Sequence, residues 1–231
     1  MGSEAQNPAL SPLVVGLVGA TGSGKTTIAK ALVTKHGFEN LHMGRPLKDM
    51  LIALGLSEQA VAGTPADREA PQPVLDGKSA RFALSTLGTK WGRNTISPRI
   101  WANAVRAKIQ MRAQAADPRP IVIDDLRFPT DWDVVTAFGG SIVRIRRPSV
   151  ETGRSPLDKA CHRLRLERFV PANGLFGWTP LHETEFHWRD APCIGEIDNT
   201  AAVTDAVAAV IALLVSQRRW LEDAAASTAL L

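Results

Sequence analysis

The sequence predicts an α/β fold in which helices cover both faces of a parallel five-stranded sheet. Short apolar segments of strand length alternate along the chain with longer segments of helical pattern. This alternation implies parallel pairing, because each crossover helix returns the chain so that the next strand runs in the same direction. The first apolar segment runs directly into a glycine-rich loop and then a helix-forming run. A hydrophobic share of 45% is ordinary for a globular protein with a buried core.

The elements follow one another in a regular order. The five strands are predicted at 13–18, 38–42, 121–124, 141–146 and 193–197. Helices are predicted at 24–35, 47–54, 80–87, 98–115 and 201–220, with one more between the third and fourth strands. Pro98 suits a first helical turn, and Pro118 ends the helix that begins there. Gly, Pro, Ala and charged residues dominate 55–78, which predicts a mobile connection.

We expect one domain over 13–220, with two insertions in its core. The core comprises 13–45, 118–148 and 190–220, and the insertions are about 46–117 and about 149–189. Residues 1–12 are polar and contain no secretory signal, so we expect a disordered arm there. Residues 221–231 are expected to form a C-terminal tail.

The loop after the first strand has the phosphate-binding pattern Gly-x-x-x-x-Gly-Lys-Thr. Its glycines let successive backbone N–H groups point at phosphate oxygens, and the positive end of the following helix favours the same anion. Lys25 would reach the β- and γ-phosphates, and the Thr26 hydroxyl would bind Mg²⁺. The pattern therefore predicts ATP and Mg²⁺ as ligands, with contacts from Gly19, Thr21, Gly22, Ser23, Gly24, Lys25, Thr26 and Thr27.

Two large classes of nucleotide-binding protein are disfavoured. The chain has no Asn-Lys-x-Asp motif, which a GTPase uses to read guanine, and no Ser-Gly-Gly signature of transporter ATPases. What remains is a small fold with two arginine-rich insertions, the organisation of a kinase that closes over two phosphate-bearing substrates and excludes water.

Three blocks make this more specific: residues 81–101, which include Leu-Gly-Thr-Lys-Trp-Gly-Arg at 87–93, Pro-Leu-Lys-Asp-Met-Leu over 46–51 and Ile-Asp-Asp-Leu-Arg-Phe-Pro over 123–129. With these blocks the chain resembles the phage-type deoxynucleoside monophosphate kinases, P-loop enzymes that transfer the γ-phosphoryl group of ATP to a deoxynucleoside monophosphate. The resemblance continues through Gly139-Gly140, Arg147-Pro148, His182-Glu183-Thr184-Glu185 and Ile197-Asp198-Asn199, in the order found in the family.

The resemblance implies roles for individual residues. Asp125 matches the family's Asp-x-Arg-Phe and is the favoured metal carboxylate, with Asp124 as second candidate; both end an apolar strand, where such folds hold the metal. Arg127 and Arg93 are expected to neutralise charge on the transferred group, which makes Lys25, Asp125, Arg127 and Arg93 the expected catalytic set. The acceptor monophosphate is expected to contact Lys48, Arg68, Arg81, Trp91, Arg93, Arg127 and Glu185.

The second insertion is expected to form a lid over ATP. It contains Arg154, Arg163, Arg165 and Arg168, and closure would bring one or two of them to the phosphates. The chain departs from the family pattern at Arg45, Lys90, Thr130 and Asp131, so the identity of the acceptor is the least constrained inference.

The resulting expectation is an ATP-dependent, Mg²⁺-dependent deoxynucleoside monophosphate kinase. Two alternatives stay open: a kinase acting on a modified base in phage DNA, which the basic pI near 9.4 allows, and a nucleotide-gated ATPase that is not a kinase.

The longest apolar stretch, 206–215, is too short to cross a bilayer, and the two cysteines indicate a reducing compartment. We therefore expect a cytoplasmic protein, in the host cytoplasm if phage-encoded, and the sequence leaves a homodimer open.

Overall fold

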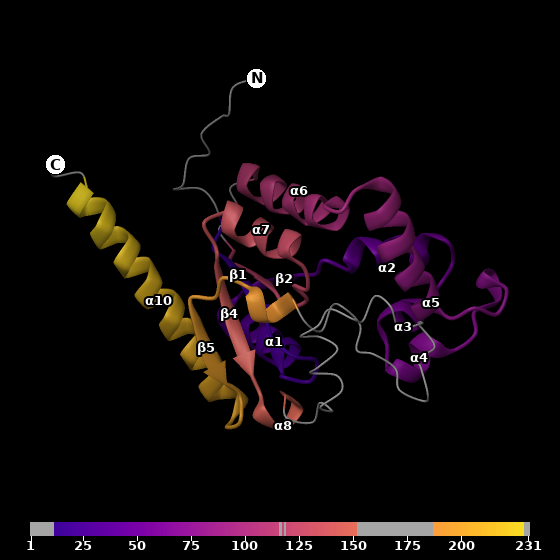
Figure 1. Cartoon of the computed structure of the whole chain (residues 1–231), viewed down its shortest axis with the longest axis horizontal. Coiled ribbons are helices and arrows are strands. Elements are labelled where there is room, and N and C mark those ends of the chain that lie inside the picture. Colours follow the sequence, from indigo (N-terminus) through magenta and orange to yellow (C-terminus); the bar gives the residue numbers. More distant parts are fainter. Residues whose placement is uncertain (1–11, 116, 118, 152–186, 229–231) are drawn as a thin grey trace, which may run out of the picture. The chain divides into compact units, whose positions relative to one another are not determined.

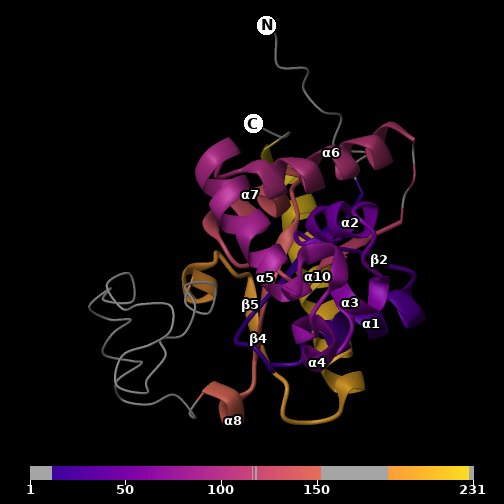
Figure 2. The same ribbon diagram turned by 90° about the vertical axis from the view of Figure 1, so that its right-hand side faces the viewer.

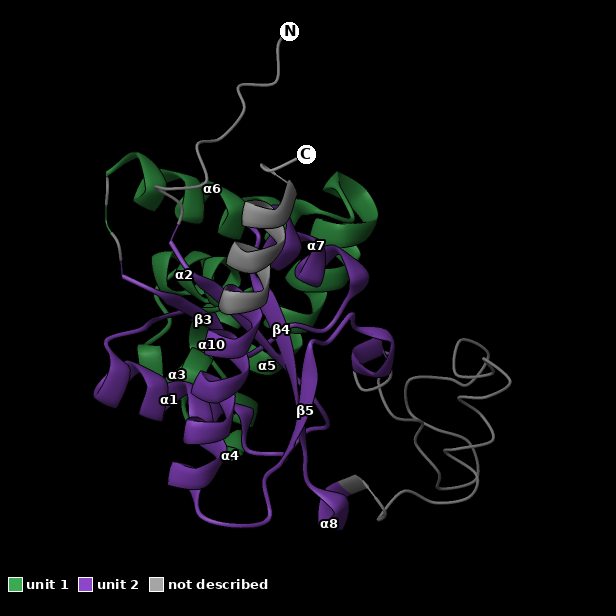
Figure 3. Ribbon diagram, turned by 90° about the vertical axis from the view of Figure 1, so that its left-hand side faces the viewer, with its two compact units in different colours: residues 1–11, 41–118 green, residues 12–40, 119–231 purple. Residues whose placement is uncertain are grey.

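The computed structural model describes residues 12–115, 117, 119–151 and 187–228, and the chain divides into two compact units (Figure 3). Unit 1 contains 41–118, together with 1–11, which lie outside the described residues. Unit 2 contains 12–40 and 119–231. The disordered arm and the greater part of the lid that the sequence predicts, 152–186, lie outside the described residues.

A five-stranded sheet forms the centre of unit 2 (Figure 1). Its strands are β1 (Val14–Val18), β2 (Glu39–Leu41), β3 (Ile121–Ile123), β4 (Ser141–Arg146) and β5 (Gly195–Asp198). Their order across the sheet is β2-β3-β1-β4-β5, and β1 pairs in parallel with both β3 and β4, as β4 does with β5. The predicted parallel five-stranded sheet is confirmed. Because the strand order reverses at β1, the carboxyl end of β1 is where such a fold binds ligands.

Helices cover both faces of this sheet. On one face, α1 (Lys25–His36) and α10 (Val203–Thr228) pack together, and their apolar side chains meet Val15, Leu17 and their neighbours on the other strands in one continuous core. On the other face, α7 (Pro129–Ala137) packs against β1 and β4. Strand side chains alternate between the faces, so Gly16 points toward α7. A methyl group on Gly16 would overlap Leu126 and meet Val135, which is why a glycine stands inside this strand.

Unit 1 is helical (Figure 2). It contains α2 (Arg45–Ala53), α3 (Glu58–Ala62), α4 (Pro65–Glu69), η2 (Pro73–Leu75), α5 (Ala80–Ser85), η3 (Thr86–Ile96) and α6 (Ile100–Gln114). Leu51, Leu56, Ala60, Val61 and Ala80 form a small core of its own, with Leu84 and Leu87 packed against it.

Two sequence predictions were wrong in this part of the chain. Three short helices occupy much of 55–78, which composition predicted as a mobile connection; Ser57 and Thr64 cap two of them by accepting the backbone N–H of Ala60 and Asp67. The predicted helix 80–87 also does not end there. It continues as η3, a π-helical segment in which the Ser97 N–H donates to the Gly92 carbonyl five residues earlier, at 2.9 Å.

The C-terminal region also differs from the prediction. Helix α10 extends to Thr228, whereas the sequence predicted a helix ending at 220 and a tail from 221. Ala-rich sequence after Trp220 has a high helix propensity, and no glycine or proline interrupts it. At the edges of the undescribed segment 152–186, the short helices α8 (Pro148–Glu151) and η6 (His187–Asp190) are described.

Candidate active site

The glycine-rich loop leaves β1 at its carboxyl end and enters α1. Gly19, Gly22 and Gly24 have φ values of 147°, 83° and 95°, in the region that favours glycine. A side chain at Gly19 would also overlap the Ile145 carbonyl of β4, and one at Gly24 would overlap the Asn199 carboxamide. The spacing of glycines in the sequence is therefore required by backbone conformation and by close contacts on both sides of the loop.

Lys25 lies across this loop. Its Nζ donates to the carbonyls of Gly19 and Ala20, both at 2.8 Å, and contacts Ser23 Oγ at 3.4 Å. Lys25 is also the first residue of α1, and no acidic residue occupies the first turn of that helix. The loop therefore joins an ammonium group to the positive end of a helix, the combination that attracts a polyphosphate.

The other predicted loop residues differ in exposure. Thr21, Gly22, Thr26 and Thr27 are exposed, whereas Ser23 is fully buried. Thr26 stands in the first turn of α1, so its hydroxyl is at the exposed entrance of the helix. A hydroxyl at this place is a suitable oxygen ligand for Mg²⁺.

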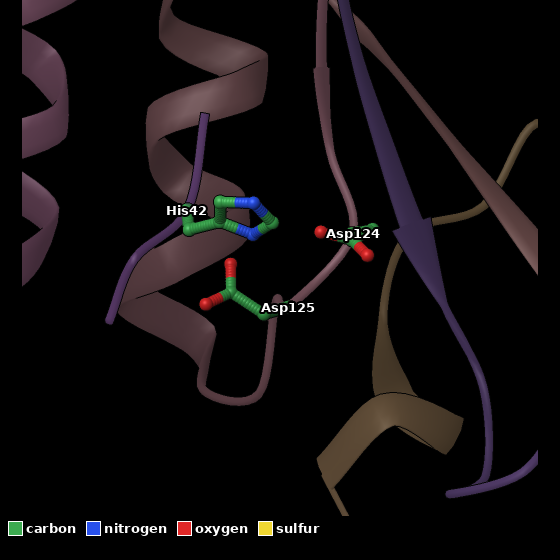
Figure 4. Close-up of side chains that lie close together, drawn as sticks. All are labelled: His42, Asp124 and Asp125. Carbon is green, nitrogen blue, oxygen red and sulfur yellow. The ribbon is translucent and has the colours of Figure 1, made fainter. Parts of the chain in front are cut away.

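Two carboxylates follow β3 directly. Asp124 is 4% exposed and Asp125 is half-buried. Figure 4 shows both carboxylates at the end of β3. Within unit 2, strand alternation places Asp124 on the face of Val122, which packs in the core beneath α1.

Two backbone hydrogen bonds fix the position of Arg127 just before α7. The N–H groups of Arg127 and Phe128 donate to Asp131 Oδ2, at 2.9 and 3.0 Å, and Asp131 is 1% exposed. The Arg127 side chain is exposed. Asp131 was noted in the sequence as a departure from the family pattern, and the structure gives it a role: it fixes the turn that presents Arg127 at the carboxyl edge of the sheet.

In unit 1, the Leu-Gly-Thr-Lys-Trp-Gly-Arg block forms most of η3. Trp101 of α6 supports it: the Trp101 Nε1–H donates to the Gly88 carbonyl at 2.9 Å, and the indole lies directly against Gly92. Trp91 is 40% exposed and its ring centroid lies 6.3 Å from that of Trp101. Arg93 is half-buried, and its Nη1 contacts the Pro98 carbonyl at 3.4 Å. π-Helical turns are frequent at functional sites, because they change the direction in which side chains point.

The remaining acceptor candidates lie on other helices of unit 1. Arg81 of α5 forms an ion pair with Glu69 at 3.3 Å, with both side chains more than half exposed. Lys48 of α2 is half-buried. Arg68 of α4 has a buried Nε with no hydrogen-bond partner among the described residues.

Arg45, a second departure from the family pattern, has a structural role. Its guanidinium contacts Asp49 at 2.7 Å and both carboxylate oxygens of Glu58, at 2.6 and 3.2 Å. The hydrogen bond to Glu58 raises the pKa of Arg45 above its usual value. Arg45 therefore links α2 to α3 within unit 1. Glu185, the last predicted substrate contact, and the four lid arginines lie outside the described residues.

Comparison with known proteins identifies the family. No family model matches the chain. A protein of Acanthamoeba polyphaga mimivirus, named "Putative deoxynucleotide monophosphate kinase", is 30% identical over 146 residues, which cover 60% of this chain and 76% of that protein. The chain belongs to the deoxynucleotide monophosphate kinase family. It is a nucleotide-binding kinase, which confirms the resemblance found in the sequence and disfavours the nucleotide-gated ATPase.

Two solved structures that align with the chain have TM-scores below 0.5. Shikimate kinase from Aquifex aeolicus aligns over 89% of this chain and 98% of its own, with 12% identity and a TM-score of 0.46. The Mycobacterium tuberculosis APS kinase CysC, solved in complex with AMPPNP and APS, aligns over 88% and 98%, with 15% identity and a TM-score of 0.41. The overall likeness is limited, and the observed strand order is what defines the fold of this kinase.

The structure adds supporting residues that the sequence analysis left without a role. Trp101 and Asn199 each donate to a backbone carbonyl of a motif, Trp101 across 13 residues of sequence and Asn199 across 176. Both residues had a signal in the sequence: Asn199 belongs to the Ile-Asp-Asn block of the family resemblance, and Trp101 is the last residue of the block 81–101. Among the described residues, no helix of the kinase is both long and apolar enough to span a bilayer.

Proposed function

We propose that this kinase transfers the γ-phosphoryl group of ATP directly to a deoxynucleoside monophosphate, giving the diphosphate and ADP. The observation that carries the proposal is the phosphate loop: three glycines with positive φ and a lysine whose Nζ lies across them, at the carboxyl end of the central strand. The family name of the mimivirus relative supports the acceptor.

In the ATP complex, the Lys25 ammonium group would donate to phosphate oxygens as well as to a loop carbonyl. The ammonium carries three hydrogens, so it can keep one loop carbonyl while it binds the β- and γ-phosphates. Loop N–H groups and the helix α1 dipole would bind the remaining oxygens. These groups are fixed before the reaction, so they stabilise developing charge without the cost of reorganisation.

The residues around the loop also fit Mg²⁺. The Thr26 hydroxyl is exposed at the start of α1, and Asp124 and Asp125 supply carboxylates at the end of the adjacent strand β3, an all-oxygen set of the kind that Mg²⁺ prefers. When bound, the ion would neutralise part of the charge of the polyphosphate. We propose that Thr26 and one aspartate, Asp125 or Asp124, are the protein ligands of Mg²⁺. Of the two aspartates, the burial of Asp124 beneath α1 favours Asp124.

For the acceptor, we propose the cationic residues of unit 1. Arg93 and Arg68 would bind the monophosphate, with Lys48 and Arg81 nearby in the same unit, and the exposed face of Trp91 offers a surface on which a base can stack. Arg127 would neutralise charge between donor and acceptor. Two bound anions placed in line need no covalent phosphoenzyme, because positioning and electrostatic stabilisation are sufficient for phosphoryl transfer.

The test is a transfer assay with γ-labelled ATP and Mg²⁺. The acceptors are the four natural deoxynucleoside monophosphates, their 5-substituted forms, the ribonucleotides and, in a separate reaction, duplex DNA carrying a hydroxymethylated base. Label in a free diphosphate supports the proposal, whereas label only in DNA would replace it with the modified-base kinase.

A matched pair of lysine variants locates the activity in the loop. Lys25→Ala should abolish transfer, whereas Lys30→Ala, a change of the same kind on the exposed side of α1, should leave transfer unchanged. Circular dichroism and thermal unfolding confirm that both variants fold. Full activity in Lys25→Ala would refute the assignment of the loop.

A further inference from the structure

Asn199 connects the end of the sheet to the phosphate loop. It follows β5 directly and is 7% exposed. Its backbone N–H donates to the Arg146 carbonyl at 2.8 Å, which extends the pairing of β4 with β5 by one hydrogen bond. Its side-chain Nδ2 donates to the Ser23 carbonyl at 2.8 Å, across 176 residues of sequence. The backbone of Asn199 is therefore fixed by the sheet, and its carboxamide is fixed on the loop.

The position of this hydrogen bond matters because of peptide geometry. The Ser23 carbonyl and the Gly24 N–H belong to one planar trans peptide, so they point in opposite directions. An amide that holds the Ser23 oxygen on one side therefore keeps the Gly24 N–H on the other side. Gly24 has a φ of 95°, and a side chain there would overlap the Asn199 carboxamide, so the same residue also explains why position 24 is glycine.

We propose that Asn199 is a positioning residue of the phosphate loop: it orients the Ser23–Gly24 peptide so that the Gly24 N–H is directed at phosphate. Asn199 touches neither phosphate nor acceptor in this role. Its effect on catalysis passes through the peptide that it holds. The inference rests on the proposed function, since it takes the loop to be the ATP site.

The chemistry of the side chain is specific. A carboxamide can donate to a carbonyl, whereas a carboxylate of the same shape is an acceptor only. Asn199→Asp would place two acceptors against each other in a buried place and add negative charge beside a polyphosphate site. Asn199→Ser keeps a donor on a shorter side chain. The order of ATP affinity should be wild type, then Asn199→Ser, then Asn199→Ala, with Asn199→Asp weakest.

The experiment compares these three variants with Asn40→Ala as the matched control. Asn40 is a half-buried asparagine on β2, the strand at the opposite edge of the sheet from β5. For each protein we would measure the unfolding temperature with and without ATP and Mg²⁺, the dissociation constant of ATP, and the KM of the acceptor. A ligand that binds the folded state raises the unfolding temperature according to its affinity, which separates loss of binding from loss of stability.

We expect Asn199→Ala to weaken ATP binding about tenfold, with a smaller ATP-induced rise in unfolding temperature and an unchanged KM for the acceptor. Asn40→Ala should keep the full ATP response. A purely structural Asn199 would lower the unfolding temperature of the free protein but leave the ATP affinity unchanged, and that result would overturn the inference. If Asn199→Ala does not fold, Asn199→Asp with wild-type ATP affinity would overturn it equally. Absence of any ATP response in the wild-type protein would instead refute the proposed function.

Discussion

The contact between Gly92 and Trp101 gives a quantitative test of how the family block in η3 is held. A Cβ atom placed on Gly92 would lie 2.8 Å from Trp101 Cε2 and 2.9 Å from the Leu87 carbonyl, well inside van der Waals contact, and nearer still to Cζ2. Trp101 is 4% exposed, and its indole N–H is engaged by the Gly88 carbonyl. The ring therefore cannot turn away from a new methyl group without losing a buried hydrogen bond.

From this geometry we expect Gly92→Ala to destabilise the protein. Overpacking of a well-packed site costs about 1–3 kcal/mol, and the better helix propensity of alanine offsets about 1 kcal/mol of that. The net loss should be up to about 2 kcal/mol, which lowers the unfolding temperature by up to roughly 8 °C in a chain of this size. Gly88→Ala is the control in the same helical segment: its Cβ would meet only the flexible end of Leu47, at 3.3 Å, so its stability should not fall.

A double-mutant cycle shows whether the cost comes from the indole. Trp101→Phe removes the ring atoms nearest to Gly92 and also removes the hydrogen bond to Gly88, itself worth about 1 kcal/mol. In the Trp101→Phe background, Gly92→Ala should therefore cost at least about 1 kcal/mol less than in the wild type. Urea unfolding of the four proteins measures the coupling. Additive effects of the two substitutions, or a stability of Gly92→Ala equal to that of Gly88→Ala, would refute the steric reasoning.

Three further outcomes follow from the site and from unit 1. Arg93→Ala should raise the acceptor KM or lower turnover while ATP affinity is kept, and an equal loss of ATP affinity in steady-state kinetics would contradict its proposed place on the acceptor. Asp131→Ala removes the acceptor of two backbone N–H groups at the start of α7, so it should cost about 1–2 kcal/mol in thermal unfolding and lower turnover through Arg127, whereas stability equal to wild type would count against this anchor. Hydrogen bonds from Thr64 and Gln59 lower the pKa of Asp67, so its ionised form adds stability above the ordinary aspartate pKa, and that stability is lost as the pH falls through the lowered value. The urea midpoints of wild type and Asp67→Asn should differ steadily above about pH 5 and converge below about pH 4, and a difference that does not change with pH would contradict the role of the carboxylate.

Local sequence was enough to predict the sheet and the phosphate loop. The central strands β1 and β3 are short apolar runs, and the loop needs glycine where φ is positive, so both leave a pattern within a few neighbouring residues. Composition gave a wrong prediction for 55–78, where polar and apolar residues alternate without a clear period. In 55–78, the short helices depend on their caps and on burial of Leu56, Ala60 and Val61 in the core of unit 1.

The sequence by itself determined that this protein has a parallel sheet with a phosphate-binding loop after its first strand, and through its motif blocks it indicated the kinase family. Only the tertiary structure decided which residues hold those motifs in place: Asn199 on the Ser23 carbonyl, Trp101 on Gly88 and Gly92, and Asp131 beneath Arg127. The physical reason is that a periodic or glycine-rich pattern records how a segment folds locally. A hydrogen bond between segments 176 residues apart leaves no such record, because the geometry that makes it possible exists only once the strands have paired.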